Sequence, residues 1–216
     1  MKSDFQESKV KWLKRLLIAI GITVLNVLCF FSVNLINSRR PSSVFYEFHT
    51  IIDSQIPYIS WTWIFYYFGD IFVTVWAAII IFKLSGKKLH RAIYAYTGMI
   101  ITAALIQIAL PGKAPWPNDM VNVQQFVHNL ISMRPYACLP SMHVALSVLP
   151  VCILYSVFKS IWIRIFSTLF AVLIAVSTLT LKEHYFLDAL AGLLLALIFY
   201  GFWRGDLKNF IKKQKV

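Results

Sequence analysis

Apolar residues run along this chain in long stretches rather than in the alternating patterns of soluble proteins. Six stretches are long enough, or nearly so, to cross the roughly 30 Å hydrocarbon layer of a bilayer as helices. A soluble helical core would show a polar face on each helix, and these stretches lack one. The predicted spans are Leu16–Asn34, Ile59–Phe82, Ala92–Leu110, Met142–Phe158, Ile161–Leu181 and Tyr185–Trp203.

The composition agrees with a membrane protein. Hydrophobic residues make up 59% of the chain and charged residues 14%, and the mean hydropathy is +0.68. We therefore predict an all-α, polytopic membrane protein with six transmembrane helices. Residues 1–216 contain no internal repeat, low-complexity segment or linker, which predicts a single domain. Two of the three cysteines lie in predicted spans, so we expect apolar packing rather than a disulfide framework.

The distribution of basic residues predicts the orientation. By the positive-inside rule, the more basic side is cytoplasmic, so both termini lie inside and three loops face outward. The formal net charge of +12 then reflects attraction to anionic lipid and implies no nucleic acid partner. The predicted inner side holds 16 basic residues: Lys2, Lys9, Lys11, Lys14, Arg15, Lys83, Lys87, Lys88, Arg91, Lys159, Arg164, Arg204, Lys208, Lys212, Lys213 and Lys215. The outer side holds five: Arg39, Arg40, Lys113, Arg134 and Lys182.

Two outer segments are longer than simple turns. Residues Pro41–Pro57 are amphipathic and begin with serines that can cap a helix, so we expect a short helix along the outer interface. Residues Pro111–Leu139 form a 29-residue loop rich in Pro, Asn and Gln. A loop of this length in a compact protein is usually functional.

Ionisable residues stand at the start of the fourth span. The sequence Cys138-Leu139-Pro140-Ser141-Met142-His143 leads into it. Proline suits a first helical turn and serine caps free N–H groups, so the positive end of this helix should attract phosphate. Taken alone, a histidine such as His143 at a helix mouth is more often an interfacial hydrogen-bonding residue than a catalyst.

The last span begins with a second polar cluster, Lys182 to Asp188. His184 and Asp188 are four residues apart and share one helix face. The carboxylate can hold the proton on one imidazole nitrogen and leave the other nucleophilic. A structural His–Asp pair fits the same spacing, but the second histidine and the nearby cations favour phosphoryl transfer.

Other polar and aromatic residues of the second span carry less information. Asp70 is either a site residue or a residue that simply bonds to a neighbouring helix. The aromatic run from Trp61 to Phe68 predicts an interfacial belt rather than a ligand site.

These motifs resemble those of the type 2 phosphatidic acid phosphatase (PAP2) superfamily, which includes lipid phosphatases and sphingolipid phosphotransferases. The six-helix plan is similar, as is Asp53-Ser54-Gln55-Ile56-Pro57-Tyr58 before the second span. Pro140-Ser141-Met142-His143 matches the family pattern Pro-Ser-x-His, and His184 with Asp188 matches His-x-x-x-Asp. The 40 residues between the two histidines also fit the family's range.

The chain departs from the family in its third motif. The family pattern begins Ser-Arg; here Ser177 fits but Thr178 replaces the arginine. Lys182 could supply the missing charge as a point contact rather than a bidentate one. A lysine at this position resembles the branch that contains relatives of inositol phosphorylceramide synthase.

The first motif, Lys-x6-Arg-Pro, is also absent in its strict form. Lys113 stands in a proline-rich segment that resembles a degenerate first motif. Arg134-Pro135 is the only Arg-Pro pair of the loop, but Val127 occupies the expected lysine position. Lys113 and Arg134 are therefore the candidate phosphate ligands from this loop.

The resemblance implies a mechanism. His184 would attack phosphorus and form a phosphohistidine, Asp188 would orient the ring, and His143 would protonate the leaving oxygen. No cofactor is implied, and the absence of an outward carboxylate cluster of the kind Mg²⁺ prefers predicts no metal. The implied ligands of the phosphate oxygens are Lys113, Arg134, Ser141 and Lys182.

We therefore expect a lipid phosphate phosphatase that acts on a mono- or diphosphate at the outer face of the membrane. Phosphatidic acid, phosphatidylglycerol phosphate, a prenyl diphosphate and a lipid A phosphate are all compatible substrates. The alternative is a lipid phosphotransferase of the inositol phosphorylceramide synthase type, in which an alcohol replaces water. A channel or transporter is disfavoured because the chain has neither inverted repeats nor a pair of broken helices. The oligomeric state is left open.

Overall fold

Helices that run side by side make up most of the molecule in the computed structural model, which describes residues 2–116 and 136–205. No strand occurs among these residues, apart from an isolated bridge between Tyr46 and Gly112. The elements are α1 (Lys2–Ser38), η1 (Ser42–Val44), α2 (Ile51–Gln55), η2 (Ser60–Thr62), α3 (Trp63–Lys83), α4 (Gly86–Ala109), α6 (Met142–Val157), α7 (Ile161–Thr180) and α8 (Phe186–Arg204).

The predicted membrane-spanning segments are all helical. Five helices of the described chain, α1, α3, α4, α7 and α8, are long and apolar enough to cross a membrane. The sixth, α6, is apolar but has only 16 residues, about 24 Å at 1.5 Å per residue. The protein is thus an all-α integral membrane protein, and a full crossing by α6 stays a prediction.

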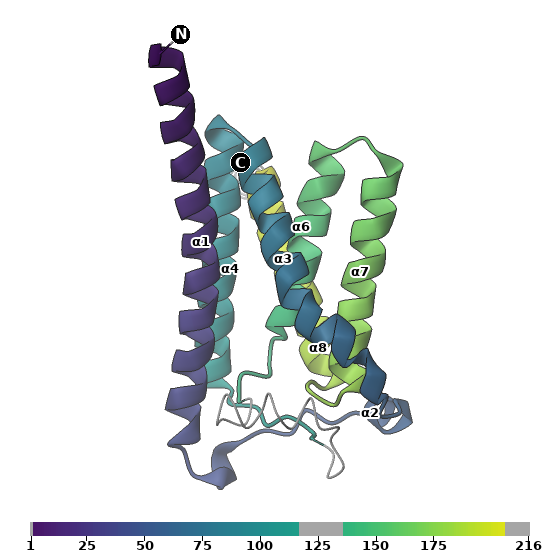
Figure 1. Ribbon diagram of the computed structural model, residues 1–216. Coiled ribbons are helices and arrows are strands. Elements are labelled where there is room, and N and C mark those ends of the chain that lie inside the picture. The colour runs from purple at the N-terminus through teal and green to yellow at the C-terminus, as the bar shows by residue number, and fades with distance from the viewer. Residues whose placement is uncertain (1, 117–135, 206–216) are drawn as a thin grey trace, which may run out of the picture.

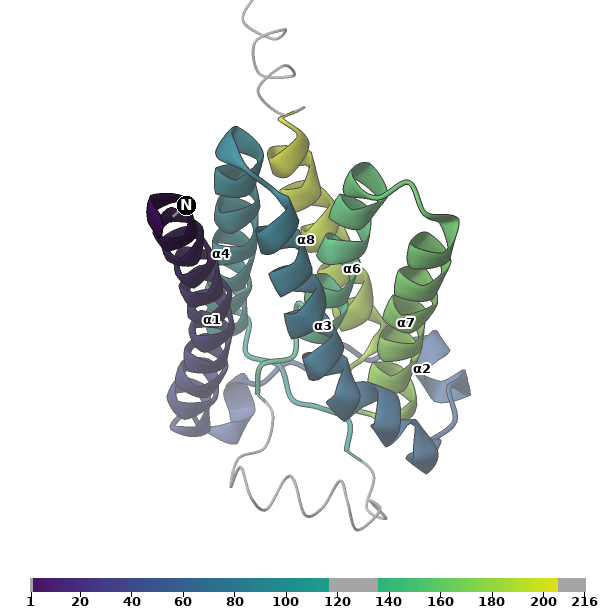
Figure 2. The ribbon, with the colours of Figure 1, turned by 45° about the horizontal axis from the view of Figure 1, so that its top comes forward.

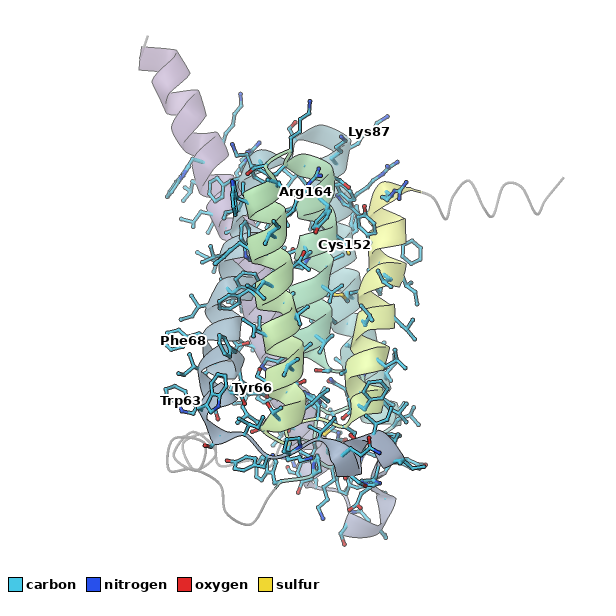
Figure 3. The ribbon with its side chains drawn as sticks, turned by 90° about the vertical axis from the view of Figure 1, so that its right-hand side faces the viewer. Trp63, Tyr66, Phe68, Lys87, Cys152 and Arg164 are labelled. Atoms are coloured by element: carbon cyan, nitrogen blue, oxygen red, sulfur yellow. The ribbon has the colours of Figure 1, made fainter. Side chains whose placement is uncertain are left out.

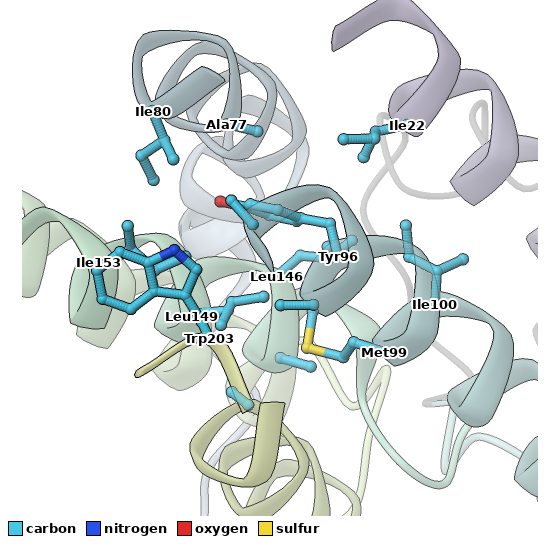
Figure 4. Packing of buried hydrophobic residues seen from close by; sticks show 14 of the residues in the cluster. Ile22, Ala77, Ile80, Tyr96, Met99, Ile100, Leu146, Leu149, Ile153 and Trp203 are labelled. Atoms are coloured by element: carbon cyan, nitrogen blue, oxygen red, sulfur yellow. The ribbon is translucent and has the colours of Figure 1, made fainter. Parts of the chain in front are cut away.

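The helices pack around α6, which contacts α3, α7 and α8, while α1 lies against α3 and α4. Figure 4 shows the core where side chains of α1, α3, α4, α6 and α8 meet. Ile80, Tyr96, Met99 and Leu149 are fully buried there. The start of α1 and the end of α8 lie at the same end of the bundle (Figures 1 and 2).

The two ends of the bundle differ in composition. Lys87 and Arg164 lie near one end, and Trp63 and Tyr66 near the other (Figure 3). The histidines at the starts of α6 and α8 belong to the second end, where the long connections lie.

The predicted helix over Pro41–Pro57 is mostly wrong. Only the short α2 and a single 3-10 turn, η1, are helical, and the backbone between them is extended. Tyr46 exchanges backbone hydrogen bonds with residues 111 and 113, and Phe45 stacks on Tyr136 at a centroid distance of 4.6 Å. Pairing with the loop after α4 competes successfully with local helix formation because it satisfies the same backbone groups.

Candidate functional site

Three buried amides fix the chain that leads into α6. The Asn37 side chain donates to the carbonyls of Gln107 and Tyr136, at 3.1 and 3.2 Å. The Gln107 side chain donates to the carbonyls of Ala137 and Pro140, at 3.3 and 2.9 Å. Asn34 of α1 accepts a bond of 2.7 Å from the backbone N–H of Tyr136. Because buried backbone groups need partners, these amides hold residues 136–140 against α1 and α4.

The start of α6 is also tied to the start of α8. The backbone N–H of Ser141 donates to the carbonyl of Asp188 at 2.9 Å. Gly192, nearly two turns into α8, lies so close that an added Cβ would stand 2.4 Å from the Ser141 carbonyl oxygen. The absence of a side chain at Gly192 thus allows the two helix starts, and their histidines, to meet.

A tight turn positions His184 between α7 and α8. Lys182 adopts a left-handed conformation with φ of 59°. The backbone N–H groups of Glu183 and His184 both donate to the carbonyl of Thr178 at 3.1 Å. Thr178 is fully buried, and its hydroxyl donates to the carbonyl of Ala175 at 2.7 Å. The position at which the PAP2 pattern has arginine is therefore part of the helix end and supplies no charge.

His184 and Asp188 form a buried pair, but they do not share a helix face as predicted, because His184 lies in the turn two residues before α8 begins. His184 Nδ1 lies 3.5 Å from Asp188 Oδ2. The same carboxylate oxygen accepts a bond of 2.9 Å from the backbone N–H of Tyr185, so it also caps α8. At 3.5 Å the imidazole contact is loose, as catalytic contacts often are without substrate. This pairing places Nε2 of His184 on the side away from Asp188.

His143 lies opposite, with its ring centroid 6.1 Å from that of His184. Its Nε2 is 3.5 Å from Asp70 Oδ1 of α3. Tyr66, one turn before Asp70, packs on the imidazole with a centroid distance of 4.2 Å and an interplanar angle of 31°. Asp70 thus both contacts a neighbouring helix and lies at the histidine pair, which combines the two predicted alternatives.

Both histidines open onto a cavity of about 410 Å³. Near the histidines it is lined by Tyr66, Asp70 and Glu183, and farther along by apolar residues of α1, α3 and α4. Tyr66 and Ala77 of α3 both line it and are 11 residues apart, so it extends roughly 16 Å along the helices. No lysine or arginine of the described chain lines this cavity.

Lys182 faces a different space. Its Nζ donates to the carbonyls of Asp53 and Ile56, at 3.1 and 2.5 Å. It lines a second cavity of about 330 Å³, which His49 and His184 also reach. Lys182 therefore fastens the segment around α2 to the turn that carries His184. A role as phosphate ligand stays a prediction.

Asp53 completes this attachment. Its carboxylate accepts hydrogen bonds from the backbone N–H of Phe186 at 2.7 Å and from the Thr50 backbone and hydroxyl at 2.7 and 2.6 Å. Burial alone would raise the pKa of Asp53, but these bonds favour the ionised form and bring the pKa below its ordinary value. The first turn of α8 is therefore held by a carboxylate that stays charged.

The structure does not bring Lys113 to the histidine pair. Lys113 is exposed, and its Nζ lies 4.0 Å from Glu47, outside both cavities. Ser141 occupies the N-cap position of α6, but its hydroxyl makes no capping hydrogen bond. This hydroxyl is fully buried and has no hydrogen-bond partner among the described residues. Arg134 lies outside the residues that the structure describes.

Two residues at the site were missed or misinterpreted from the sequence. Glu183 is 2% exposed and accepts a bond of 3.0 Å from the Trp116 indole, yet nothing in the sequence distinguishes it from a solvated loop carboxylate. The aromatic run from Trp61 to Phe68 predicts that Tyr66 belongs to an interfacial belt. Its neighbour Trp61 is exposed as a belt residue would be, but Tyr66 itself packs on His143.

Comparison with known proteins agrees with this geometry. A family model described as the PAP2 superfamily matches residues 44–202, which include both histidines and Asp188. No curated protein and no solved structure matches the chain. Members of the superfamily generally hydrolyse phosphate esters or transfer their phosphoryl group. Since the match covers well over half of the sequence, the chain belongs to the PAP2 superfamily.

Proposed function

We propose that the protein is a lipid phosphate phosphatase that works through a phosphohistidine on His184. The observation that carries this proposal is the pair of imidazoles, 6.1 Å apart between ring centroids, at one end of a cavity with apolar walls. This separation leaves room for a phosphoryl group between a nucleophile and an acid.

The proposed steps use groups already in place. His184 Nε2 attacks phosphorus while Asp188 holds the Nδ1 proton and stabilises the charge that develops on the ring. His143 protonates the leaving oxygen and then takes a proton from water, which attacks the phosphohistidine. The start of α6 adds the positive end of a helix dipole close to the reacting phosphate. Lys113, Arg134, Ser141 and Lys182 remain the proposed ligands of the phosphate oxygens. Lys113, Ser141 and Lys182 would reach the phosphate only after local movement.

The shape of the cavity supports a lipid substrate. Its length of roughly 16 Å is close to half of the ~30 Å hydrocarbon layer, that is, to one leaflet. A lipid with its phosphate at the histidines could therefore place one hydrocarbon chain along Phe30, Ala77 and Ile100. Residues of α1 also line this apolar part of the cavity. The helix α1 lies before residues 44–202, the segment that matches the family model.

The proposed orientation places the histidine end at the outer or periplasmic face of the membrane. Lys87 and Arg164 at the opposite end support a cytoplasmic location for that end, together with both termini.

The first experiment is phosphate release by the purified protein from a panel of lipid mono- and diphosphates in the presence of EDTA. His184→Ala serves as the paired variant. Release that survives EDTA and is lost in the variant supports metal-independent histidine catalysis, and acid-labile ³²P on the wild-type chain supports the intermediate. Release that EDTA abolishes, or that His184→Ala retains, would contradict the proposal.

A lipid phosphotransferase of the inositol phosphorylceramide synthase type is the second candidate. It is favoured by Glu183, a buried carboxylate that lines the cavity beside the histidines and could accept a hydrogen bond from an alcohol. Lys182 in the third motif, as in that branch of the family, points the same way. A phosphorylated product that forms only when an alcohol acceptor is added would distinguish it from the phosphatase.

A further inference from the structure

Asp70 has an unusual position for a carboxylate. It lies in α3, which is long and apolar enough to span a membrane, where an ionised side chain is costly and tends to be functional. Its side chain is 68% exposed and lines the cavity that holds both histidines. Among the described residues, its carboxylate makes no hydrogen bond, and its charged contact is with His143.

The site thus holds two imidazole–carboxylate pairs. The distance is the same in both, but the carboxylates contact different ring nitrogens. Asp188 lies 3.5 Å from Nδ1 of His184, and Asp70 lies 3.5 Å from Nε2 of His143. Asp188 also caps α8, whereas Asp70 has no comparable backbone bond among the described residues. A carboxylate beside one imidazole nitrogen selects the tautomer that carries its proton there.

We propose that Asp70 is a positioning residue for His143, an inference that rests on the proposed phosphatase chemistry. Asp70 holds the Nε2 proton of His143, so that Nδ1 exchanges the reacting proton with the substrate. Tyr66, packed against the ring at a tilt of 31°, limits its rotation and supports the same orientation.

The two steps balance with this assignment. In the first, His184 Nε2 bonds to phosphorus, the bond from phosphorus to the leaving oxygen breaks, and that oxygen takes the Nδ1 proton of the His143 imidazolium. His143 is then neutral, with its remaining proton on Nε2 toward Asp70. In the second, water attacks phosphorus and gives a proton to Nδ1. The P–N bond breaks, its electron pair returns to His184, and inorganic phosphate leaves.

A purely structural contact between α3 and α6 would behave differently. Loss of acid catalysis harms a substrate with a poor leaving group far more than one whose leaving group needs no proton. Loss of structure harms both substrates alike. Comparison of an alkyl phosphate with an aryl phosphate therefore separates the two roles.

The experiment measures kcat/KM for dodecyl phosphate and 4-nitrophenyl phosphate with the wild type, Asp70→Asn, His143→Ala and the double variant. This constant reports formation of the phosphohistidine and not its hydrolysis, which both substrates share. We expect Asp70→Asn to lose about 10²-fold on dodecyl phosphate and less than ~10-fold on 4-nitrophenyl phosphate. In the His143→Ala background, Asp70→Asn should add nothing, since it acts through that ring. Equal losses on both substrates, or additive losses in the double variant, would overturn the proposal.

A second measurement needs no turnover, so it distinguishes this inference from the proposed function. At a pH at which His143 is neutral, nitrogen-15 NMR of histidine-labelled full-length protein should show this ring as the Nε2–H tautomer. Its signal is identified among the five histidines by its disappearance in His143→Ala. Asp70→Asn should shift this signal. An Nδ1–H tautomer, or a spectrum unchanged by Asp70→Asn, would refute the pairing even in an active enzyme.

Discussion

Gly192→Ala should separate the two helix starts that carry the histidines. The new Cβ would lie 2.4 Å from the Ser141 carbonyl oxygen and 3.2 Å from Val144 Cβ. Real Cβ atoms essentially never come within 3.0 Å, so the backbone at Ser141 must move by at least about 0.6 Å. The obstacle is a backbone oxygen rather than the end of a flexible side chain, so α6 and α8 must themselves shift.

The cost follows from this geometry. Overpacking of a close contact destabilises by about 1–3 kcal/mol. A shift of about 1 Å in a catalytic group can cost ~10²-fold in rate, so we expect a loss of roughly 10- to 100-fold in kcat on a lipid phosphate. Thermal unfolding in detergent micelles and phosphate release measure the two effects.

Gly21→Ala in α1 is the matched control, because a Cβ there meets nothing within 4 Å. It should leave the rate unchanged and stabilise the helix by up to about 1 kcal/mol. If Gly192→Ala kept the wild-type rate and melting temperature, the close approach of α6 and α8 would be wrong. A lower melting temperature with an unchanged rate would show that the start of α6 does not position the site.

Three further changes test other parts of the structure. Asp53→Asn should lower the free energy of unfolding by about 1–2 kcal/mol near neutral pH. The pKa of Asp53 in the folded protein lies below its ordinary value of 3.8. The stability difference between wild type and variant should therefore be complete above pH 3.8 and disappear as the pH falls through the pKa of the folded state. Melting curves across that pH range would check this. Ala77→Phe fills the end of the cavity that is far from the histidines, so it should lower the rate on long-chain alkyl phosphates but not on short ones. Val75→Phe, on the exposed face of α3, is the control and should leave the dependence of the rate on chain length unchanged. Gln107→Leu leaves the carbonyls of Ala137 and Pro140 without their donor, so it should lower the free energy of unfolding by about 1–3 kcal/mol. An unchanged free energy of unfolding would mean that this amide does not hold the chain before α6.

Much of the fold could be predicted because its signals are local. A run of apolar residues requires a helix in lipid, where each backbone group must bond within its own segment. The predicted starts of α6 and α7 agree with the structure, and the other helix ends differ mainly where basic residues such as Lys87 extend a helix beyond its apolar part. Lysine has a high helix propensity but is not apolar, so a prediction from hydropathy alone misses the first turns of α4.

The segment from Pro41 to Pro57 shows where local signals fail. Its amphipathic pattern predicts a helix, but Tyr46 pairs with backbone more than 60 residues later, and the segment is extended there. The attraction of Lys182 to the carbonyls of Asp53 and Ile56 likewise depends on a partner far along the chain. Such competition depends on distant partners that no window of sequence contains.

For the site, the sequence by itself determined that His184 and Asp188 lie close together, because only three residues separate them. The turn before α8, rather than a shared helix face, brings their side chains into contact. It also determined that His143 stands at a helix start. Only the tertiary structure decided that Asp70 and Tyr66 meet His143, that Glu183 is buried beside the histidines, and that α1 walls the cavity. Contacts between helices depend on how each one rotates and how closely it approaches its neighbours. That is set by side-chain packing, down to the missing Cβ of Gly192, and not by the periodicity of any single segment.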